Sequence, residues 1–152
     1  MALPNIFNKE VSEGVIDRIN NLNHQTQPKW GKMSVEKMLA HCSVTYEYVY
    51  ENKYTKPGFM RGLLLKLVVK GIVTNEKPYK HGTPTGPDFV ITDERVFETE
   101  KQRLVGFIRK TQELGESHFD GKESHSFGAL NKDQWNNMFY KHLDHHLSQF
   151  GV

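Results

Sequence analysis

Helical periodicity runs through most of this chain and constrains its fold more than any other feature. Apolar residues recur at three- and four-residue steps in segments that predict helices over residues 9–22, 34–53, 92–115 and 131–150. A shorter segment over residues 57–71 is apolar on nearly every side and is expected to be mostly buried. No alternating pattern predicts a strand pair. We therefore expect an all-α bundle of four principal helices and one additional short helix.

Residues at the segment ends support these boundaries. Thr92 can cap the fourth helix, and Gly115 predicts its end. Asn131 and Gln134 have the spacing of a capping box before the last helix. The intervening residues 74–92 hold several prolines and glycines, which predicts a long irregular loop rather than a regular element.

Composition narrows the class of protein. A chain of 152 residues fits a single domain over residues 1–152, and its net charge of +2 comes from interspersed acidic and basic residues, unlike a nucleic-acid-binding patch. Cys42 is the one cysteine, so no internal disulfide is expected. The first residues do not resemble a signal peptide, and the apolar stretch 59–73 is short and interrupted by charges. A cytoplasmic protein without a membrane span is expected.

Histidine spacing predicts a metal site. His142 and His146 stand four residues apart in the last predicted helix and share one face. At roughly 100° per residue, His146 falls in the middle of the apolar face, His142 on its flank and His145 at the rim. His41 borders the buried stripe of the second helix and is the candidate for a third nitrogen ligand. Three histidines with open positions are typical of a catalytic metal site.

The spacing alone also admits simpler interpretations. Histidines four residues apart occur by chance, and histidines near a helix C-terminus are favoured by the helix dipole. Taken singly, His41 is typical of a packed or rim residue, and Cys42 of a small buried hydrophobe. Lys66 and Lys70 are typical of a solvated stripe, with contact to a partner or a membrane surface as the alternative.

A general base is not evident among the carboxylates. Asp144 falls on the outer face of the last predicted helix. The candidate catalytic residues are instead His125, in the loop before that helix, and His145 at its rim, as a proton relay or as groups that orient the ligands. The Pro- and Gly-rich segment 77–88 is expected to form part of a pocket wall or a mobile cover.

Two ordered motifs carry a family resemblance. The C-terminal motif contains His125-Ser126-Phe127-Gly128 and Tyr140-Lys141-His142-Leu143-Asp144-His145-His146. The N-terminal motif is Trp30-Gly31-Lys32-Met33-Ser34, followed by Met38-Leu39-Ala40-His41. They resemble an uncharacterised bacterial branch of the DinB-like superfamily, which often has proline where this chain has Ser126, and the resemblance covers nearly the whole chain.

This resemblance implies a DinB-like four-helix bundle that holds a divalent metal, commonly zinc, nickel or iron. Carried over residue by residue, the ligands are His41, His142 and His146, the same three that helical phase selects. The implied activity is that of a metal-dependent hydrolase or a thiol-dependent transferase. Its substrate would be a small molecule, for which a thiol is one candidate, and many members of the superfamily form homodimers. The alternative is a non-catalytic bundle that acts through dimerisation or partner binding by the 59–73 helix.

Overall fold

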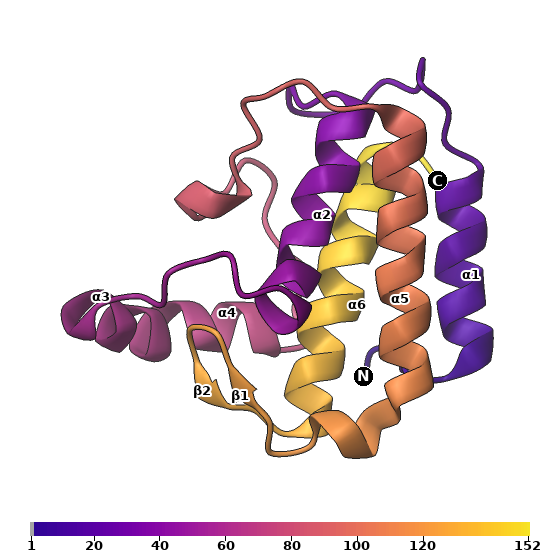
Figure 1. The fold of residues 1–152 in the computed structure, drawn as a ribbon. Coiled ribbons are helices and arrows are strands. Elements are labelled where there is room, and N and C mark those ends of the chain that lie inside the picture. Colours follow the sequence, from indigo (N-terminus) through magenta and orange to yellow (C-terminus); the bar gives the residue numbers. More distant parts are fainter. Residues whose placement is uncertain (1) are drawn as a thin grey trace.

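The computed structural model describes residues 2–152, and most of them are helical. Four long helices lie side by side (Figure 1). They are α1 (Lys9–Asn20), α2 (Val35–Tyr50), α5 (Phe97–Phe119) and α6 (Lys132–Gln149). Both α1 and α2 pack against α5 and α6, so the four helices enclose one core. The predicted all-α class is confirmed.

The core is built from the apolar positions that the helical spacing selected. Every long helix contributes side chains that are at most 1% exposed: Ile16 and Ile19, Met38 and Leu39, Leu104 and Ile108, and Trp135, Phe139 and Leu143. Burial of each such side chain contributes about 1.5–3 kcal/mol. Because these residues recur at three- and four-residue steps, each helix gathers them in one stripe, and that stripe faces the core.

Helix ends follow the predictions in part. The side chain of Asn131 accepts from the backbone N–H of Gln134 and the Gln134 side chain accepts in return, so the predicted capping box is confirmed. The predicted start at Thr92 is wrong, because α5 begins at Phe97. Gly115 adopts the left-handed φ of 74° expected of a stop, yet helical structure resumes after it and continues to Phe119. The short helical turn after Gly115 places the side chain of Phe119 in the core.

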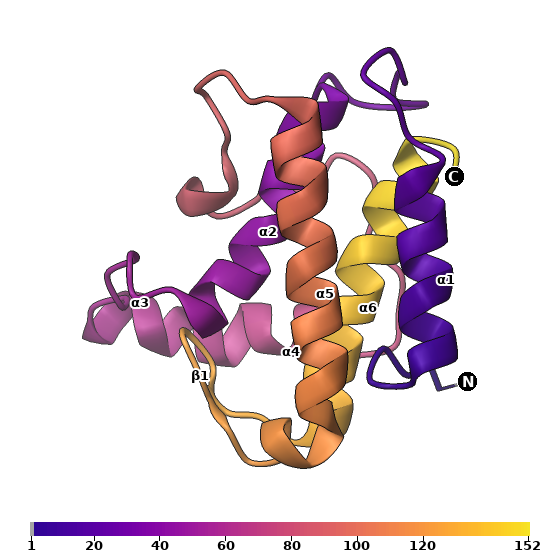
Figure 2. The same cartoon turned by 45° about the vertical axis from the view of Figure 1, so that its right-hand side comes forward.

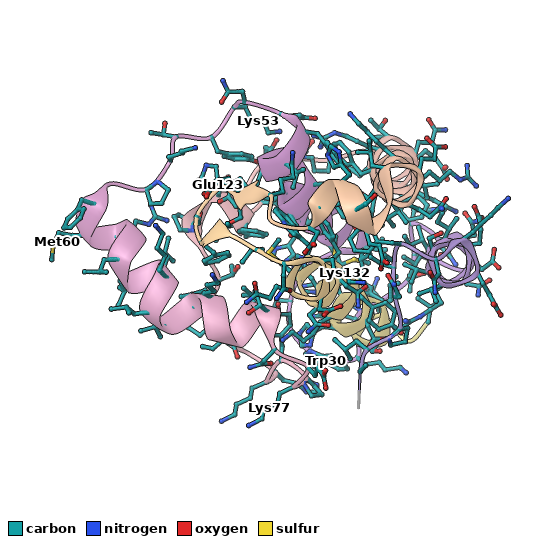
Figure 3. All side chains as sticks on the ribbon, turned by 90° about the horizontal axis from the view of Figure 1, so that it is seen from below. Trp30, Lys53, Met60, Lys77, Glu123 and Lys132 are labelled. Carbon is teal, nitrogen blue, oxygen red and sulfur yellow. The ribbon has the colours of Figure 1, made fainter. Side chains whose placement is uncertain are left out.

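The prediction that the segment 57–71 is mostly buried is wrong. α3 (Phe59–Leu64), the π-helical turn η1 (Leu65–Val69) and α4 (Lys70–Thr74) form a continuous rod, hereafter the α3–α4 rod. It projects from the bundle with Met60 near its tip (Figure 3). Met60 is 75% exposed and Leu67 74% exposed. The apolar sequence of this segment does not show whether another part of the chain covers it. Its burial could therefore not be predicted from the sequence.

Two short elements complete the fold. β1 (Glu123–Ser124) and β2 (Gly128–Ala129) form an antiparallel hairpin before α6, which the sequence did not predict because strands of two residues show no alternation. The connection between α4 and α5 includes the 3-10 turn η2 (Pro87–Phe89) and runs along α2 and α6 (Figures 1 and 2). Within residues 2–152, no helix is long and apolar enough to cross a membrane.

Candidate metal centre

The fold brings together His41 of α2 with His142 and His146 of α6. One ring nitrogen from each of the three lies within 4.8 Å of the others. The Nε2 atoms of His41 and His142 are 3.0 Å apart, and the three ring centroids are separated by 4.5–5.0 Å. Nitrogen ligands about 2.0–2.1 Å from a tetrahedral zinc ion would be about 3.3 Å apart. The group therefore has dimensions that could hold a metal ion.

The backbone of η2 orients His41. Its Nδ1 atom lies 2.8 Å from the carbonyl oxygen of Phe89. A carbonyl oxygen can only accept, so Nδ1 carries the proton and Nε2 presents a lone pair to the centre. Phe89 also packs its ring edge-on against His41, with centroids 5.3 Å apart.

A side-chain amide orients His146 in the same way. Gln149 donates through Nε2 to the carbonyl oxygen of Trp30 at 2.8 Å, which leaves Oε1 to face His146. That oxygen lies 2.8 Å from Nδ1 of His146 and accepts its proton. The Nε2 atom of His146 is then free to act as a ligand.

Thr45 partners the third histidine. Its Oγ1 atom lies 3.0 Å from Nδ1 of His142, and a hydroxyl can either donate or accept. When Thr45 donates, Nε2 of His142 carries the proton and can donate to Nε2 of His41. When Thr45 accepts, both Nε2 atoms present lone pairs to the same point and require a cation there. The hydroxyl thus permits both the tautomer of a metal-free centre and the tautomer that a metal needs.

Burial keeps these imidazoles neutral. Removal from water is the largest cause that lowers the pKa of His41, against a smaller opposing effect of its bond to Phe89. Burial lowers the pKa of His142 well below its ordinary value, and that of His146 to about 3. Neutral imidazoles are the form that binds a metal, so the centre needs little proton release at neutral pH.

The two remaining candidates lie at different places. His145 is half-buried, and its ring centroid is 5.0 Å from that of His146, at the rim position that helical phase predicts. Burial also lowers the pKa of His145. His125 instead stacks on Tyr48 at 4.2 Å, and its Nδ1 atom lies 2.8 Å from Ser126 Oγ. The structure therefore places His145 beside the three-histidine group and His125 in a separate aromatic cluster, and a catalytic role for either stays a prediction.

The three histidines open onto a large cavity. Its volume is about 1170 Å³, and its walls come from α2, α6, the α3–α4 rod, the hairpin and the α4–α5 connection. Residues 79–86 of that connection line the cavity, so the predicted place of the Pro- and Gly-rich segment in a pocket wall is confirmed. The ring of Trp30 stacks on that of His81 at 3.9 Å and joins this wall to the loop before α2.

Sequence reasoning missed the residues that orient the candidate ligands. Thr45 stands four residues after His41, and Gln149 stands three residues after His146, so both share a helix face with a ligand. That spacing could have identified them. The carbonyl groups of Phe89 and Trp30 could not be found in this way, because the fold alone brings those loops to the centre.

Comparison with known proteins places the chain in a family. It belongs to the family described as "Protein of unknown function (DUF1569)", which matches residues 8–151. No curated protein and no solved structure matches the chain. The three histidines and their partners all fall within the matched residues.

Proposed function

We propose that this chain is a DinB-like metal-binding protein in which His41, His142 and His146 hold a divalent zinc, nickel or iron ion. It would act on a small molecule as a metal-dependent hydrolase or a thiol-dependent transferase. The observation that carries this proposal is the set of hydrogen bonds to Phe89, Thr45 and Gln149, which lie at the Nδ1 atoms and, with Thr45 as the acceptor, leave each Nε2 atom available. Four long helices around one core support the DinB-like fold.

Three neutral nitrogen ligands leave positions for a substrate. A divalent ion with such a ligand set lowers the pKa of a bound water or thiol, which makes both hydrolysis and thiol transfer available. His145 is the better candidate for a proton acceptor, because its ring lies beside His146 and its lowered pKa keeps it neutral. His125 also lines the cavity and would contact substrate farther from the ion.

Metal analysis of protein purified without an affinity tag tests the metal site. We expect about one divalent ion per chain in the parent protein and loss of that ion when His41, His142 and His146 are replaced together by alanine. A double variant of the exposed histidines His24 and His118 serves as the matched control and should retain the ion. A metal-free parent protein that also fails to take up zinc would overturn the proposal.

Cobalt substitution separates the two activities. Cobalt(II) bound to a thiolate gives a charge-transfer absorption band that cobalt(II) bound to water lacks. Titration of the cobalt-loaded protein with 2-mercaptoethanol should produce this band if the centre accepts a thiol. A spectrum that does not change would favour the hydrolase.

The exposed α3–α4 rod favours a second candidate, a non-catalytic bundle that forms a homodimer. Phe59, Met60 and Leu67 are at least 74% exposed, and exposed apolar patches of this kind mark interaction sites. The exposed apolar side chains of the rod would form the dimer contact, so the dimer should persist when salt screens charges. Light scattering over a range of concentrations and salt tests this candidate. A monomer under all conditions would exclude it, and Leu67→Asp should abolish any dimer.

A further inference from the structure

The charged residues that line the cavity are all basic. Among the described residues, the charged lining side chains are Lys32, Lys37, Arg61 and Lys80. A cavity of this composition favours an anionic occupant.

Three of these cations belong to segments that meet at one end of the bundle. Lys37 stands one turn before His41 on α2. Lys32 and Lys80 lie next to the stacked pair formed by Trp30 and His81. The Nζ atom of Lys37 reaches the backbone carbonyl oxygen of Thr92 at 3.4 Å, and the carboxylate of Asp93 is the opposite charge that interacts with it.

On the other side of the histidines, the wall formed by the rod carries Leu65, Val69 and Val73 together with one cation, Arg61. α2 and α6 are antiparallel, since the N–H of Lys29 before α2 donates to the carbonyl oxygen of Gln149 at the end of α6. Along α2, Lys37, His41 and Val49 line the cavity in that order, and Val49 lies about 12 Å beyond His41.

Cavity-lining residues along α6 follow the same order, and the α3–α4 rod lies beyond them. Along α6, His146 and His142 are followed by Met138 in the same direction. Asn137 donates to the carbonyl oxygen of Thr74 at 2.9 Å, which places the rod at this apolar level. The lining positions of the rod include Val69, a half-buried residue.

We infer that the cavity binds an amphipathic organic anion, with its acidic group at Lys32, Lys37 and Lys80 and its apolar part against Met138 and Val69. The histidine centre lies between the two ends, so the middle of such a ligand would face the ion. The inference rests on the proposed function only for this last point. The ligand class follows from the cavity walls alone.

Calorimetric titration with three probes of equal chain length tests the ligand class. Decanoate should bind at least about tenfold more tightly than decanol, and decyltrimethylammonium should not bind measurably. Equal affinity for decanoate and decanol would overturn the inference. Each titration is made with chelator-treated and with zinc-loaded protein. Decanoate binding by the chelator-treated protein then tests the inference without the metal, while zinc uptake tests the proposed function without the ligand.

Matched variants locate the two ends of the ligand. Replacing Lys32, Lys37 and Lys80 by glutamine should weaken decanoate binding by about tenfold and leave decanol binding unchanged. The control triple variant replaces Lys9, Lys101 and Lys110 on α1 and α5, with the same change in net charge, and should bind decanoate as the parent does. Equal losses in the two triple variants would overturn the assignment of the acidic end.

Two adjacent valines provide the corresponding pair for the apolar end. Val69 lines the cavity, whereas Val68 is 52% exposed on the outside of the rod. Val69→Asn should weaken both decanoate and decanol, and Val68→Asn should weaken neither. Circular dichroism confirms that both variants fold. Equal affinities in the two variants would place the apolar part elsewhere and overturn the assignment.

Discussion

Gln149 holds His146 by a hydrogen bond of 2.8 Å between Oε1 and Nδ1. The other end of the same amide donates to the loop before α2. A ligand candidate on the last helix is therefore held in place by a loop more than a hundred residues away in the sequence. The Gln149 amide links this loop to His146.

Removal of this amide should weaken the metal site without unfolding the bundle. Gln149→Leu deprives Nδ1 of His146 of its acceptor, so the ring can rotate and its tautomer is no longer fixed. We expect zinc affinity to fall by about 10–100-fold, measured by competition with a chromophoric chelator. Gln149→Glu keeps an acceptor oxygen for Nδ1 but loses the donor to the carbonyl oxygen of Trp30, so it should retain more of the affinity than Gln149→Leu does. Unchanged affinity in Gln149→Leu would show that the amide does not orient His146.

Gly31 tests the same link from the loop side. Its φ is +81°, and a Cβ atom at this position would lie 2.8 Å from Nε2 of Gln149. Gly31→Ala should therefore reduce both stability, by about 1–2 kcal/mol, and zinc affinity. Gly121 has a φ of +76° with nothing near its Cβ position, so Gly121→Ala should reduce stability alone. Chemical denaturation and zinc competition measure the two effects, and equal zinc affinities in the two variants would contradict the prediction.

The hydroxyl of Thr45 should matter more for metal affinity than for folding. Thr45→Val keeps the shape of the side chain and removes the partner of His142 Nδ1. We expect roughly tenfold weaker zinc binding, while Thr45→Ser should bind zinc nearly as the parent does. If Thr45→Val and Thr45→Ser bind zinc equally well, the hydroxyl does not set the tautomer of His142.

The environment of Glu47 predicts that the free energy of unfolding falls at acidic pH. It is 2% exposed and receives hydrogen bonds or ion pairs from Lys53, Tyr54 and Arg103. Burial alone would raise the pKa of Glu47, but the bonds from these three partners outweigh it and lower the pKa below its ordinary value. The stabilisation is thus complete above the unfolded pKa of about 4.3 and is lost as the pH falls through the lower folded value.

A charge-neutral variant measures this contribution. Glu47→Gln should lower the free energy of unfolding by roughly 1–3 kcal/mol at neutral pH. The difference from the parent should shrink as the pH falls below about 4.3. Glu98→Gln, at an exposed position of α5, should show neither effect. A difference between Glu47→Gln and the parent that does not vary with pH in urea denaturation would contradict this account.

The sequence predicted the parts of this fold that depend on local periodicity. The phase of His142, His145 and His146 is correct because a helix fixes angles between nearby residues. The capping box at Asn131 is likewise a local interaction. Both needed no knowledge of the tertiary fold.

What the sequence did not predict depends on contacts between distant segments. The α3–α4 rod is exposed because it projects beyond the four long helices. The apolar sequence of a helix does not show whether another element covers it. The carbonyl groups that face His41 and Gln149 belong to loops whose paths only the fold defines. Every residue has a backbone carbonyl oxygen, so the residue type does not show which of them will accept these hydrogen bonds.

Diffraction data from zinc-soaked crystals, collected on both sides of the zinc absorption edge, test the central claim most directly. We predict one anomalous peak per chain, about 2.0–2.1 Å from a ring nitrogen of each of His41, His142 and His146. Absence of a peak at this position, or a peak bound by other residues, would contradict the proposal that these three histidines form a metal centre.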